Sequence, residues 1–452
     1  MKYDLIVIGG GPAGYNCAER ATHAGLNVAV IEQAKLGGVC LNSGCIPSKA
    51  LLQSAKVADY VRHADMYGVQ ATYNGVNHKF ILDRKNRIVR KLVAGIKLQL
   101  KSANVTVIEG KAIIKDKQDN LYTISVNDQT YTCTYLIIAT GSTAIIPPIK
   151  GVTEGVNEGR VLDNVGILDL ADIPANLVVI GGGVIGLEMA SYYTSMGSQV
   201  TVVEALSKIA GNTDSQVTAI LQTNYEKKGV RFLTNTMAVA IDNEGVTVKS
   251  GDQLTRLPAD KVLLSVGRKA NAIDGIDRLG IATNRGFIVT DEHLRTNIDN
   301  VYAIGDCNGK VMLAHTAYRE GEVAVNTIMG IDDYINYDAI PSVIYTNPEI
   351  ASIGKTAEQA TNDGLTIVEQ TLPMQYSGRY VAENTTTDGI CKLVLHNDRL
   401  IGATIIGNGA SEFIVLLSAM IGLDINIEQL KTVVFPHPTV SEIIRESIFS
   451  LE

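Results

Sequence analysis

The first apolar run of the chain is short and rich in β-branched residues, so Leu5–Ile8 predicts a buried strand. Four glycines follow within Gly9–Gly14, and the pattern then becomes that of a helix from 15 to 24. A second apolar run, 27–31, ends in Glu32. This order of strand, glycine turn, helix, strand and acid is the one that dinucleotide binding requires.

Three of the four glycines of this turn have an expected role. Gly9 permits the tight turn, Gly11 lets the backbone approach a pyrophosphate, and Gly14 allows the helix to pack closely on the strand. The helix N-terminus supplies amides and a favourable dipole for phosphates. Glu32 is placed to accept hydrogen bonds from ribose hydroxyls. The N-terminal segment is therefore predicted to bind a dinucleotide.

The same pattern recurs later in the chain. An apolar run at 177–180 leads into Gly181–Gly186, a helix to Met196, a strand at 199–203 and Glu204. A carboxylate at that position pairs with a free 2′-hydroxyl and repels a 2′-phosphate, which favours NAD over NADP. Two complete fingerprints predict two dinucleotides, and two dinucleotides imply that electrons move between them.

Composition narrows the class of protein. The chain has 39 Lys and Arg against 47 Asp and Glu, a net charge of −8 that argues against nucleic acid as a partner. Its longest apolar stretch, 413–423, is about half the ~20 residues of a membrane helix. The run at 5–8 is too short for a signal peptide. We expect a cytoplasmic protein with no membrane partner, and no metal site is predicted.

Two of the six cysteines, Cys40 and Cys45, lie close together soon after Glu32. In a regular helix, residues five apart have Cα atoms about 8–9 Å apart, whereas a disulfide needs less than about 7 Å. A bridge therefore requires an irregular first turn, which Gly44 and Pro47 would favour; two unconnected thiols remain the alternative. The other four are expected to be small buried side chains: Cys17, Cys133, Cys307 and Cys391.

From Asp4 to about Arg445 the sequence resembles the pyridine nucleotide–disulfide oxidoreductases, and within them the branch that oxidises dihydrolipoamide with NAD. The resemblance is carried by nine segments, of which the second and the last are the most specific: Gly9–Gly14, Gly37–Lys49, Ala139–Ser142, Gly181–Glu188, Val266–Arg268, Ala303–Asp306, Met312–His315, Tyr345–Ile350 and His437–Glu442.

The resemblance implies an α/β fold with two Rossmann-like dinucleotide-binding domains, for FAD and NAD, and an α+β C-terminal dimerisation domain. The FAD-binding domain is expected at 1–145, resuming at 269–338. The NAD-binding domain is expected at 146–268 and the interface domain at 339–452. Within the interface domain we expect strands at 390–395 and 400–406 and helices at about 411–422 and 440–449.

The resemblance also implies site residues. Asp306 is expected to bind the ribitol of FAD, and Lys49 and Glu188 are expected to pair beside the flavin and the nicotinamide. The FAD contacts implied are Gly9, Gly11, Gly14, Glu32, Lys49, Ala112, Thr140, Gly141, Asp306, Met312, Leu313, Ala314 and His315. The NAD contacts implied are Gly181, Gly183, Ile185, Gly186, Glu188, Glu204 and Gly267.

A histidine between two prolines, His437, stands near the C-terminus with Glu442 close enough to orient its ring. That arrangement suits a general base. In the family this histidine serves the partner subunit's active site, which implies a homodimer. Phe435 departs from the histidine that lipoamide enzymes commonly carry there, so the tuning of the base is open.

The expected reaction is oxidation of a dithiol on a lipoylated carrier domain of a 2-oxo-acid dehydrogenase or glycine-cleavage type complex. His437 takes a proton, the thiolate attacks Cys40, and Cys45 passes electrons through FAD to NAD. The alternatives are an NADH-dependent reductase of another disulfide or quinone-like acceptor, and a flavin-binding redox-sensing adaptor. Cys40, Cys45, His437 and Glu442 argue against the adaptor, which needs none of them.

Overall fold

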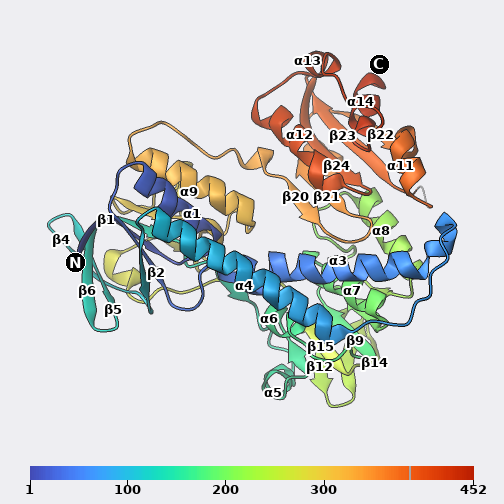
Figure 1. Cartoon of the computed structure of the whole chain (residues 1–452), viewed down its shortest axis with the longest axis horizontal. Coiled ribbons are helices and arrows are strands. Elements are labelled where there is room, and N and C mark those ends of the chain that lie inside the picture. Colours follow the sequence, from blue (N-terminus) through green and yellow to red (C-terminus); the bar gives the residue numbers. More distant parts are fainter. Residues whose placement is uncertain (386–387, 452) are drawn as a thin grey trace. The chain divides into compact units, whose positions relative to one another are not determined.

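A computed structural model describes residues 1–385 and 388–451 of the chain (Figure 1). By internal contacts the chain divides into two units. The first unit contains 1–50, 82–145 and 267–335, and the second contains 51–81, 146–266 and 336–452. Two long helices contribute residues to both units: α3 (Cys45–Arg62) and α4 (His78–Ser102).

The first unit is built on a seven-stranded sheet with the order β3-β2-β1-β6-β5-β4, in which β19 also pairs with β6. The pairs β1–β2, β2–β3, β1–β6 and β6–β19 are parallel, whereas β4, β5 and the start of β6 form an antiparallel meander. The strands are β1 (Lys2–Ile8), β2 (Val28–Glu32), β3 (Thr106–Glu109), β4 (Ile113–Gln118), β5 (Leu121–Val126), β6 (Gln129–Ile138) and β19 (Val301–Ala303).

The core of this sheet comes from the apolar runs seen in the sequence: Ile6, Ile31, Leu136 and Val301 are all buried. The helices are α1 (Pro12–His23), α2 (Gly38–Ser43) and α9 (Ala314–Ile328). Short strands complete the unit, namely β7 (Ser142–Ala144) with β16 (Arg268–Ala270), and β17 (Thr283–Asn284) with β18 (Phe287–Ile288). The first predicted strand–turn–helix–strand unit is confirmed.

The second unit contains a five-stranded parallel sheet of order β11-β10-β9-β15-β8 and an antiparallel meander β12-β13-β14. Its strands are β8 (Val161–Leu162), β9 (Asn176–Ile180), β10 (Gln199–Val203), β11 (Arg231–Leu233), β12 (Met237–Asp242), β13 (Gly245–Ser250), β14 (Gln253–Pro258) and β15 (Lys261–Leu264). Its helices are α5 (Val152–Asn157), α6 (Asn164–Leu168), α7 (Val184–Met196) and α8 (Ser215–Lys227). The second predicted nucleotide unit is thus also present.

The C-terminal part of the second unit is an antiparallel sheet of order β20-β21-β24-β23-β22 covered by helices (Figure 1). The strands are β20 (Ser342–Ile344), β21 (Ile350–Gly354), β22 (Val368–Pro373), β23 (Ile390–His396) and β24 (Arg399–Ile406). The helices are α10 (Ala357–Asn362), α11 (Gly378–Glu383), α12 (Ala410–Gly422), α13 (Ile427–Lys431) and α14 (Glu442–Phe449). The four elements predicted here are confirmed as β23, β24, α12 and α14.

Helix α12, the longest apolar stretch, buries Ile414, Leu417 and Met420 in the core of this sheet and leaves Val415 exposed. Among residues 1–385 and 388–451, no helix is both long enough and apolar enough to cross a membrane. The same residues contain no group of three or more His, Cys, Asp and Glu side chains able to hold a metal ion.

Candidate active site

The first glycine turn is held by the acid at the end of β2. The two carboxylate oxygens of Glu32 accept hydrogen bonds from the amides of Gly10 and Ala34, each at 2.7 Å. Helix α1 begins directly after Gly11, so its first amides point toward the turn. Glu32 therefore fixes the turn in addition to any ribose contact that it makes.

Steric limits explain why this turn needs glycine. A Cβ atom on Gly9 would overlap the carbonyl oxygen of Ala139, and one on Gly14 would overlap that of Gly9. At Gly11 the only nearby atom is the Cα of Gly38, 3.7 Å from where a Cβ would lie. The face of the turn is thus lined by backbone, which fits the approach of a pyrophosphate.

The predicted ribitol ligand Asp306 lies in a polar cluster of the first unit. The hydroxyl of Ser142 donates a short hydrogen bond to Asp306, and Arg268 Nε donates to the same hydroxyl at 2.7 Å. Arg268 Nε is 4.0 Å from the Asp306 carboxylate. Ser142 and Arg268 therefore orient the carboxylate from one side. The Asp306 side chain is still 26% exposed, so it can accept hydrogen bonds from a polyol.

The remaining residues assigned to FAD also lie in the first unit. Asn271 ties down the segment after β6, because its side chain donates to Thr140 O at 2.8 Å and its amide donates to Gly141 O at 3.0 Å. Ala112 is buried in the core of the sheet. The last four of these residues lie at the start of α9: Met312, Leu313, Ala314 and His315. His315 is exposed.

Cys40 and Cys45 form a disulfide, and their Cα atoms are 4.7 Å apart. The chain achieves this by breaking the helix at Gly44, between the end of α2 and the start of α3. The irregular turn that a bridge requires is therefore confirmed. Cys45 is the first residue of the 18-residue helix α3, where the helix dipole stabilises a thiolate.

The other four cysteines are buried and unbridged, as predicted: Cys17, Cys133, Cys307 and Cys391. Burial raises the pKa of each of these thiols to about 12. They remain protonated at neutral pH and are poor nucleophiles. Thiol chemistry is thus confined to the Cys40–Cys45 pair.

The second glycine turn has the same hydrogen bonds to its strand-end acid as the first. Glu204 accepts from the amides of Gly182 at 2.7 Å and Leu206 at 2.8 Å. A Cβ atom on Gly186 would overlap the Gly181 carbonyl oxygen. Apart from the neighbours of Gly183 in the chain, none of the residues that the structure describes has an atom within 4 Å of a Cβ on Gly183. The open space at Gly183 fits a pyrophosphate.

Three further residues assigned to the nicotinamide side are now located. Ile185 is half-buried at the start of α7. Glu188 is buried in the same helix and accepts from the amide of Tyr345 at 3.1 Å. Gly267 belongs to the first unit, and its carbonyl accepts from the amide of Ile145 at 3.0 Å. Lys49, assigned to the flavin side, is half-buried in α3.

His437 and Glu442 lie at the C-terminal end of the second unit. The ring Nδ1 of His437 is 2.8 Å from Glu442 Oε1, and the Thr439 amide donates to Glu442 Oε2 at 2.8 Å. The hydrogen bond from the Thr439 amide and, to a smaller extent, the neighbouring His437 hold the pKa of Glu442 below its usual value. The carboxylate therefore stays ionised and fixes Nδ1, while the ring is 79% exposed and leaves Nε2 available to a substrate.

Sequence reasoning missed several residues that support these sites. Ser142 and Arg268 orient Asp306, and buried Glu320 accepts from the amide of Gly305 and, at 3.0 Å, from the side chain of Asn308. A charged residue on the buried face of α9 is the one sequence signal that would have indicated Glu320.

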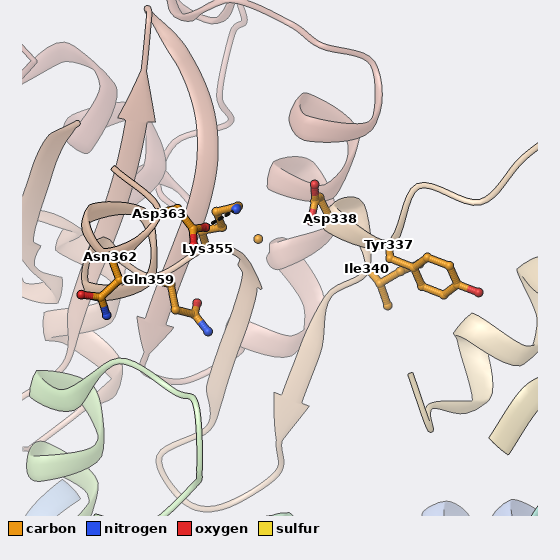
Figure 2. A pocket seen from close by; sticks show the side chains of 8 residues that line it. Tyr337, Asp338, Ile340, Lys355, Gln359, Asn362 and Asp363 are labelled. Carbon is orange, nitrogen blue, oxygen red and sulfur yellow. Dashed lines mark hydrogen bonds and ion pairs between the residues drawn. The ribbon is translucent and has the colours of Figure 1, made fainter. Parts of the chain in front are cut away.

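An open pocket of about 440 Å³ lies in the C-terminal part, between the turn at Tyr337–Ala339 and α10 (Figure 2). Its lining includes Lys355 and Asp363, which form an ion pair with each other. None of the predicted site residues lines it.

Comparison with known proteins gives a consistent result. Residues 3–321 match the pyridine nucleotide-disulphide oxidoreductase family, and residues 340–448 match its dimerisation domain. The chain is 36% identical over 455 residues to the dihydrolipoyl dehydrogenase of Mycoplasma pneumoniae, covering 99% of this chain and 98% of that protein. It is 39% identical over 457 residues to the Bacillus subtilis dihydrolipoyl dehydrogenase, with 99% and 96% covered. The structure of the HOCl-induced flavoprotein disulfide reductase RclA from Escherichia coli matches with a TM-score of 0.85 at 29% identity, over 100% of both chains.

Proposed function

This chain belongs to the pyridine nucleotide-disulphide oxidoreductase family, and from that premise we propose that it oxidises protein-bound dihydrolipoamide and reduces NAD, as a dihydrolipoyl dehydrogenase does. The observation that carries the proposal is the disulfide at the start of α3. The segment that leads into it lies against the first glycine turn, since the amide of Gly37 donates to Gly10 O at 2.8 Å. FAD bound at that turn would therefore lie near the thiol exchange.

We assign the proton transfer to His437. Glu442 holds Nδ1, so Nε2 is the nitrogen that removes a proton from a substrate thiol. Proton removal makes the thiolate, which is the attacking species in disulfide exchange. The exposure of this ring suits a base that acts on a substrate carried by another protein.

The exchange itself uses the Cys40–Cys45 bond. The substrate thiolate attacks Cys40 Sγ, which forms a mixed disulfide and releases Cys45 as a thiolate at the N-terminus of α3. The second substrate thiol, once deprotonated, attacks the substrate sulfur of the mixed disulfide and releases Cys40. The substrate leaves as a cyclic disulfide, and two electrons remain on the two cysteines.

When bound, FAD would supply the acceptor for these two electrons, and NAD would supply the final acceptor, to which they would pass as a hydride. The residues proposed to hold FAD are those of the first glycine turn with Glu32 and Asp306. The second turn and Glu204 are proposed to hold NAD, and the position of Glu204 favours NAD over NADP.

The dimerisation domain at residues 340–448 supports a homodimer. We propose that His437 acts in the active site of the partner subunit and that the substrate is a lipoylated carrier domain.

The test is NAD reduction by the purified holoenzyme, with free dihydrolipoamide and dithiothreitol compared at equal concentration. We expect dihydrolipoamide to be oxidised at least roughly 100-fold faster, since positioning of a specific substrate contributes that much or more. NADP should support less than about a tenth of the NAD rate, because Glu204 repels the 2′-phosphate.

Equal rates with the two dithiols would overturn the proposal in favour of a reductase of another disulfide or of a quinone-like acceptor. That alternative predicts rapid NADH oxidation by such an acceptor with the Cys40–Cys45 pair intact. FAD binding without turnover of either dithiol would instead indicate the redox-sensing adaptor.

A further inference from the structure

The segment that follows the acid of the second turn, residues 205–213, forms one wall of that turn; we call it the nucleotide loop. The amide of Leu206 donates to Glu204 Oε1 at 2.8 Å, and the amide of Ala210 donates to Gly182 O at 2.8 Å. The second contact ties the loop to the backbone of the turn directly, and the first ties it to Glu204, whose other carboxylate oxygen accepts from the Gly182 amide. A displacement of the loop would therefore change the site where the adenosine half of NAD is proposed to lie.

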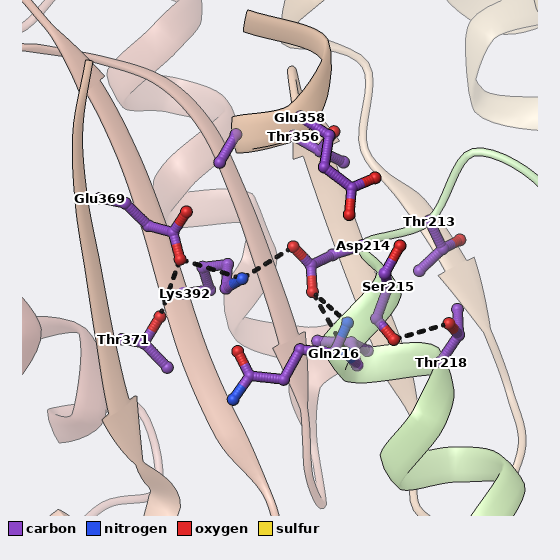
Figure 3. Close-up of polar contacts among 12 residues, drawn as sticks. Thr213, Asp214, Ser215, Gln216, Thr218, Thr356, Glu358, Glu369, Thr371 and Lys392 are labelled. Atoms are coloured by element: carbon purple, nitrogen blue, oxygen red, sulfur yellow. Dashed lines mark hydrogen bonds and ion pairs between the residues drawn. The ribbon is translucent and has the colours of Figure 1, made fainter. Parts of the chain in front are cut away.

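The loop ends at Asp214, which is fixed on both carboxylate oxygens (Figure 3). Oδ1 accepts from the amides of Gln216 at 2.9 Å and Val217 at 3.2 Å, so the side chain caps the N-terminus of α8. Oδ2 accepts from Lys392 Nζ at 2.9 Å. Asp214 is 2% exposed, and Lys392 is 7% exposed.

Lys392 comes from β23, a central strand of the C-terminal sheet. Its ammonium group also lies 3.0 Å from Glu369 Oε1, on the neighbouring strand β22 (Figure 3). Burial acts to lower the pKa of Lys392, but the hydrogen bonds to Asp214 and Glu369 outweigh it and hold that pKa above its usual value. The lysine is therefore a permanent cation with both partners in place.

A second contact ties the same loop to α10. Lys208 Nζ donates to Thr213 O at 2.8 Å and to Ser215 Oγ at 3.0 Å, and it is 3.7 Å from Glu358 Oε2. This pair is partly exposed and contributes little by itself. The Asp214–Lys392 pair is the buried one. Loss of the lysine charge would leave the buried Asp214 carboxylate without a cation, whereas loss of the Asp214 charge would leave Lys392 with Glu369 alone.

We propose that Lys392 is a positioning residue for the NAD site: the C-terminal sheet holds Asp214 through it, and so fixes the nucleotide loop against the second glycine turn. Affinity for the adenosine half of NAD then depends on a residue in the dimerisation domain. The inference rests on the proposed function, since it requires NAD to bind at Gly181–Gly186.

The experiment compares Lys392→Met holoenzyme with wild type by calorimetric titration of ADP-ribose, which carries the adenosine half of NAD and is redox-inert. We expect the Kd for ADP-ribose and the KM for NAD to rise at least tenfold. The kcat at saturating NAD should change less than twofold, and FAD content should not change. Lys431→Met is the matched control, because Lys431 pairs with Glu428 on the surface of the same domain; we expect wild-type affinity.

Asp214→Asn removes the charge and keeps a side chain that caps helices well. We expect its Kd to rise at least threefold, and this variant decides the question where Lys392→Met does not fold. The double variant Lys392→Met/Asp214→Asn leaves neither member of the pair charged, so it should bind ADP-ribose more tightly than Lys392→Met alone.

A Kd within twofold of wild type in Lys392→Met, or in Asp214→Asn where the first variant does not fold, would overturn the inference. Glu204→Ala separates this result from a failure of the proposed function. If wild type binds ADP-ribose and Glu204→Ala does not weaken it, the nucleotide lies elsewhere, and both the assignment of NAD to this turn and the inference are wrong.

Discussion

The two glycine turns of this chain are built alike but covered differently. In each, a strand-end acid accepts from the amide of the second glycine at 2.7 Å, and the last glycine packs on the carbonyl of the first. In the first turn, however, the Cα of Gly38 lies 3.7 Å from where a Cβ of Gly11 would be. In the second turn, no described residue other than the chain neighbours of Gly183 has an atom within 4 Å of the equivalent position.

This difference matches the two ligands that we propose. FAD remains bound while electrons pass through it, and a turn covered by the chain's own backbone suits a resident cofactor. NAD must enter and leave in every cycle, and an open turn suits a ligand that binds and dissociates. The segment that covers the first turn continues directly into Cys40, so the cover of this turn and the disulfide belong to one short stretch of chain.

Replacement of Cys45 should have the strongest effect of all. It should remove the dithiol reaction at the disulfide near the first turn and leave the reaction of NADH bound at the second turn intact. Cys45→Ser should lower dithiol-driven NAD reduction by roughly 1000-fold or more, because the bond that receives the electrons is gone. FAD should stay bound, and NADH oxidation by ferricyanide should continue near the wild-type rate. Long-wavelength charge-transfer absorbance on reduction should disappear; a retained band would show that Cys45 does not lie next to the flavin.

Replacement of His437 should affect proton removal from the substrate thiol and leave both glycine turns unchanged. His437→Gln should slow dithiol oxidation by about 10²- to 10⁴-fold, the usual contribution of a general base. The ferricyanide reaction and the ADP-ribose affinity should stay within twofold of wild type. Equal losses in the dithiol and ferricyanide reactions would instead indicate a structural role for His437.

The sequence predicts the two turns well because each is local. Strand, glycines, helix and acid follow one another within about one βαβ unit, and the residues that meet in space are near one another in the chain. The same holds for His437 and Glu442, which are separated by five residues. The break at Gly44 could also be anticipated, since no regular helix brings residues five apart into bridging distance.

The supporting contacts could not be predicted in this way. Ser142, Arg268 and Asp306 meet through three separate segments, and Asp214 meets Lys392 across 178 residues of chain. A lysine within an apolar strand looks the same in the sequence whether it is buried beside a carboxylate or exposed at the edge of a sheet. The sequence around Lys392 therefore does not indicate its partner. Only the packed structure shows which charges are paired.

A smaller effect tests the cover over the first turn. Gly38 has a φ of +57°, and a Cβ there would lie 2.7 Å from the Cα of Gly11, so Gly38→Ala must push the cover away. Overpacking of this kind costs about 1–3 kcal/mol, which corresponds to a roughly 5- to 150-fold weaker affinity for FAD. The measurement is FAD retained after gel filtration in dilute buffer, read from the absorbance spectrum.

Gly211→Ala is the matched control for Gly38→Ala. Gly211 has a φ of +56°, but among residues 1–385 and 388–451 only its own chain neighbours come within 4 Å of its Cβ position. It shares the cost of a left-handed residue, roughly 1–2 kcal/mol, without the clash. If Gly211→Ala loses as much FAD as Gly38→Ala, the loss reflects backbone strain in general, and the cover over the flavin turn has no special role.

The smallest effect compares the two turns at one equivalent residue. Gly11 and Gly183 both precede a helix, with φ of −75° and −79°, so alanine is unstrained at either position. At Gly183 the added methyl group occupies only the space proposed for the pyrophosphate of NAD. Gly183→Ala should therefore raise the KM for NAD by roughly five- to tenfold, at the lower end of the about 1–3 kcal/mol that one misplaced methyl group costs, and leave FAD content unchanged. Gly11→Ala should do the reverse, weakening FAD while sparing ADP-ribose affinity. If each variant weakened both nucleotides, the two turns would not act independently, and the division into a resident and an exchanging site would be wrong.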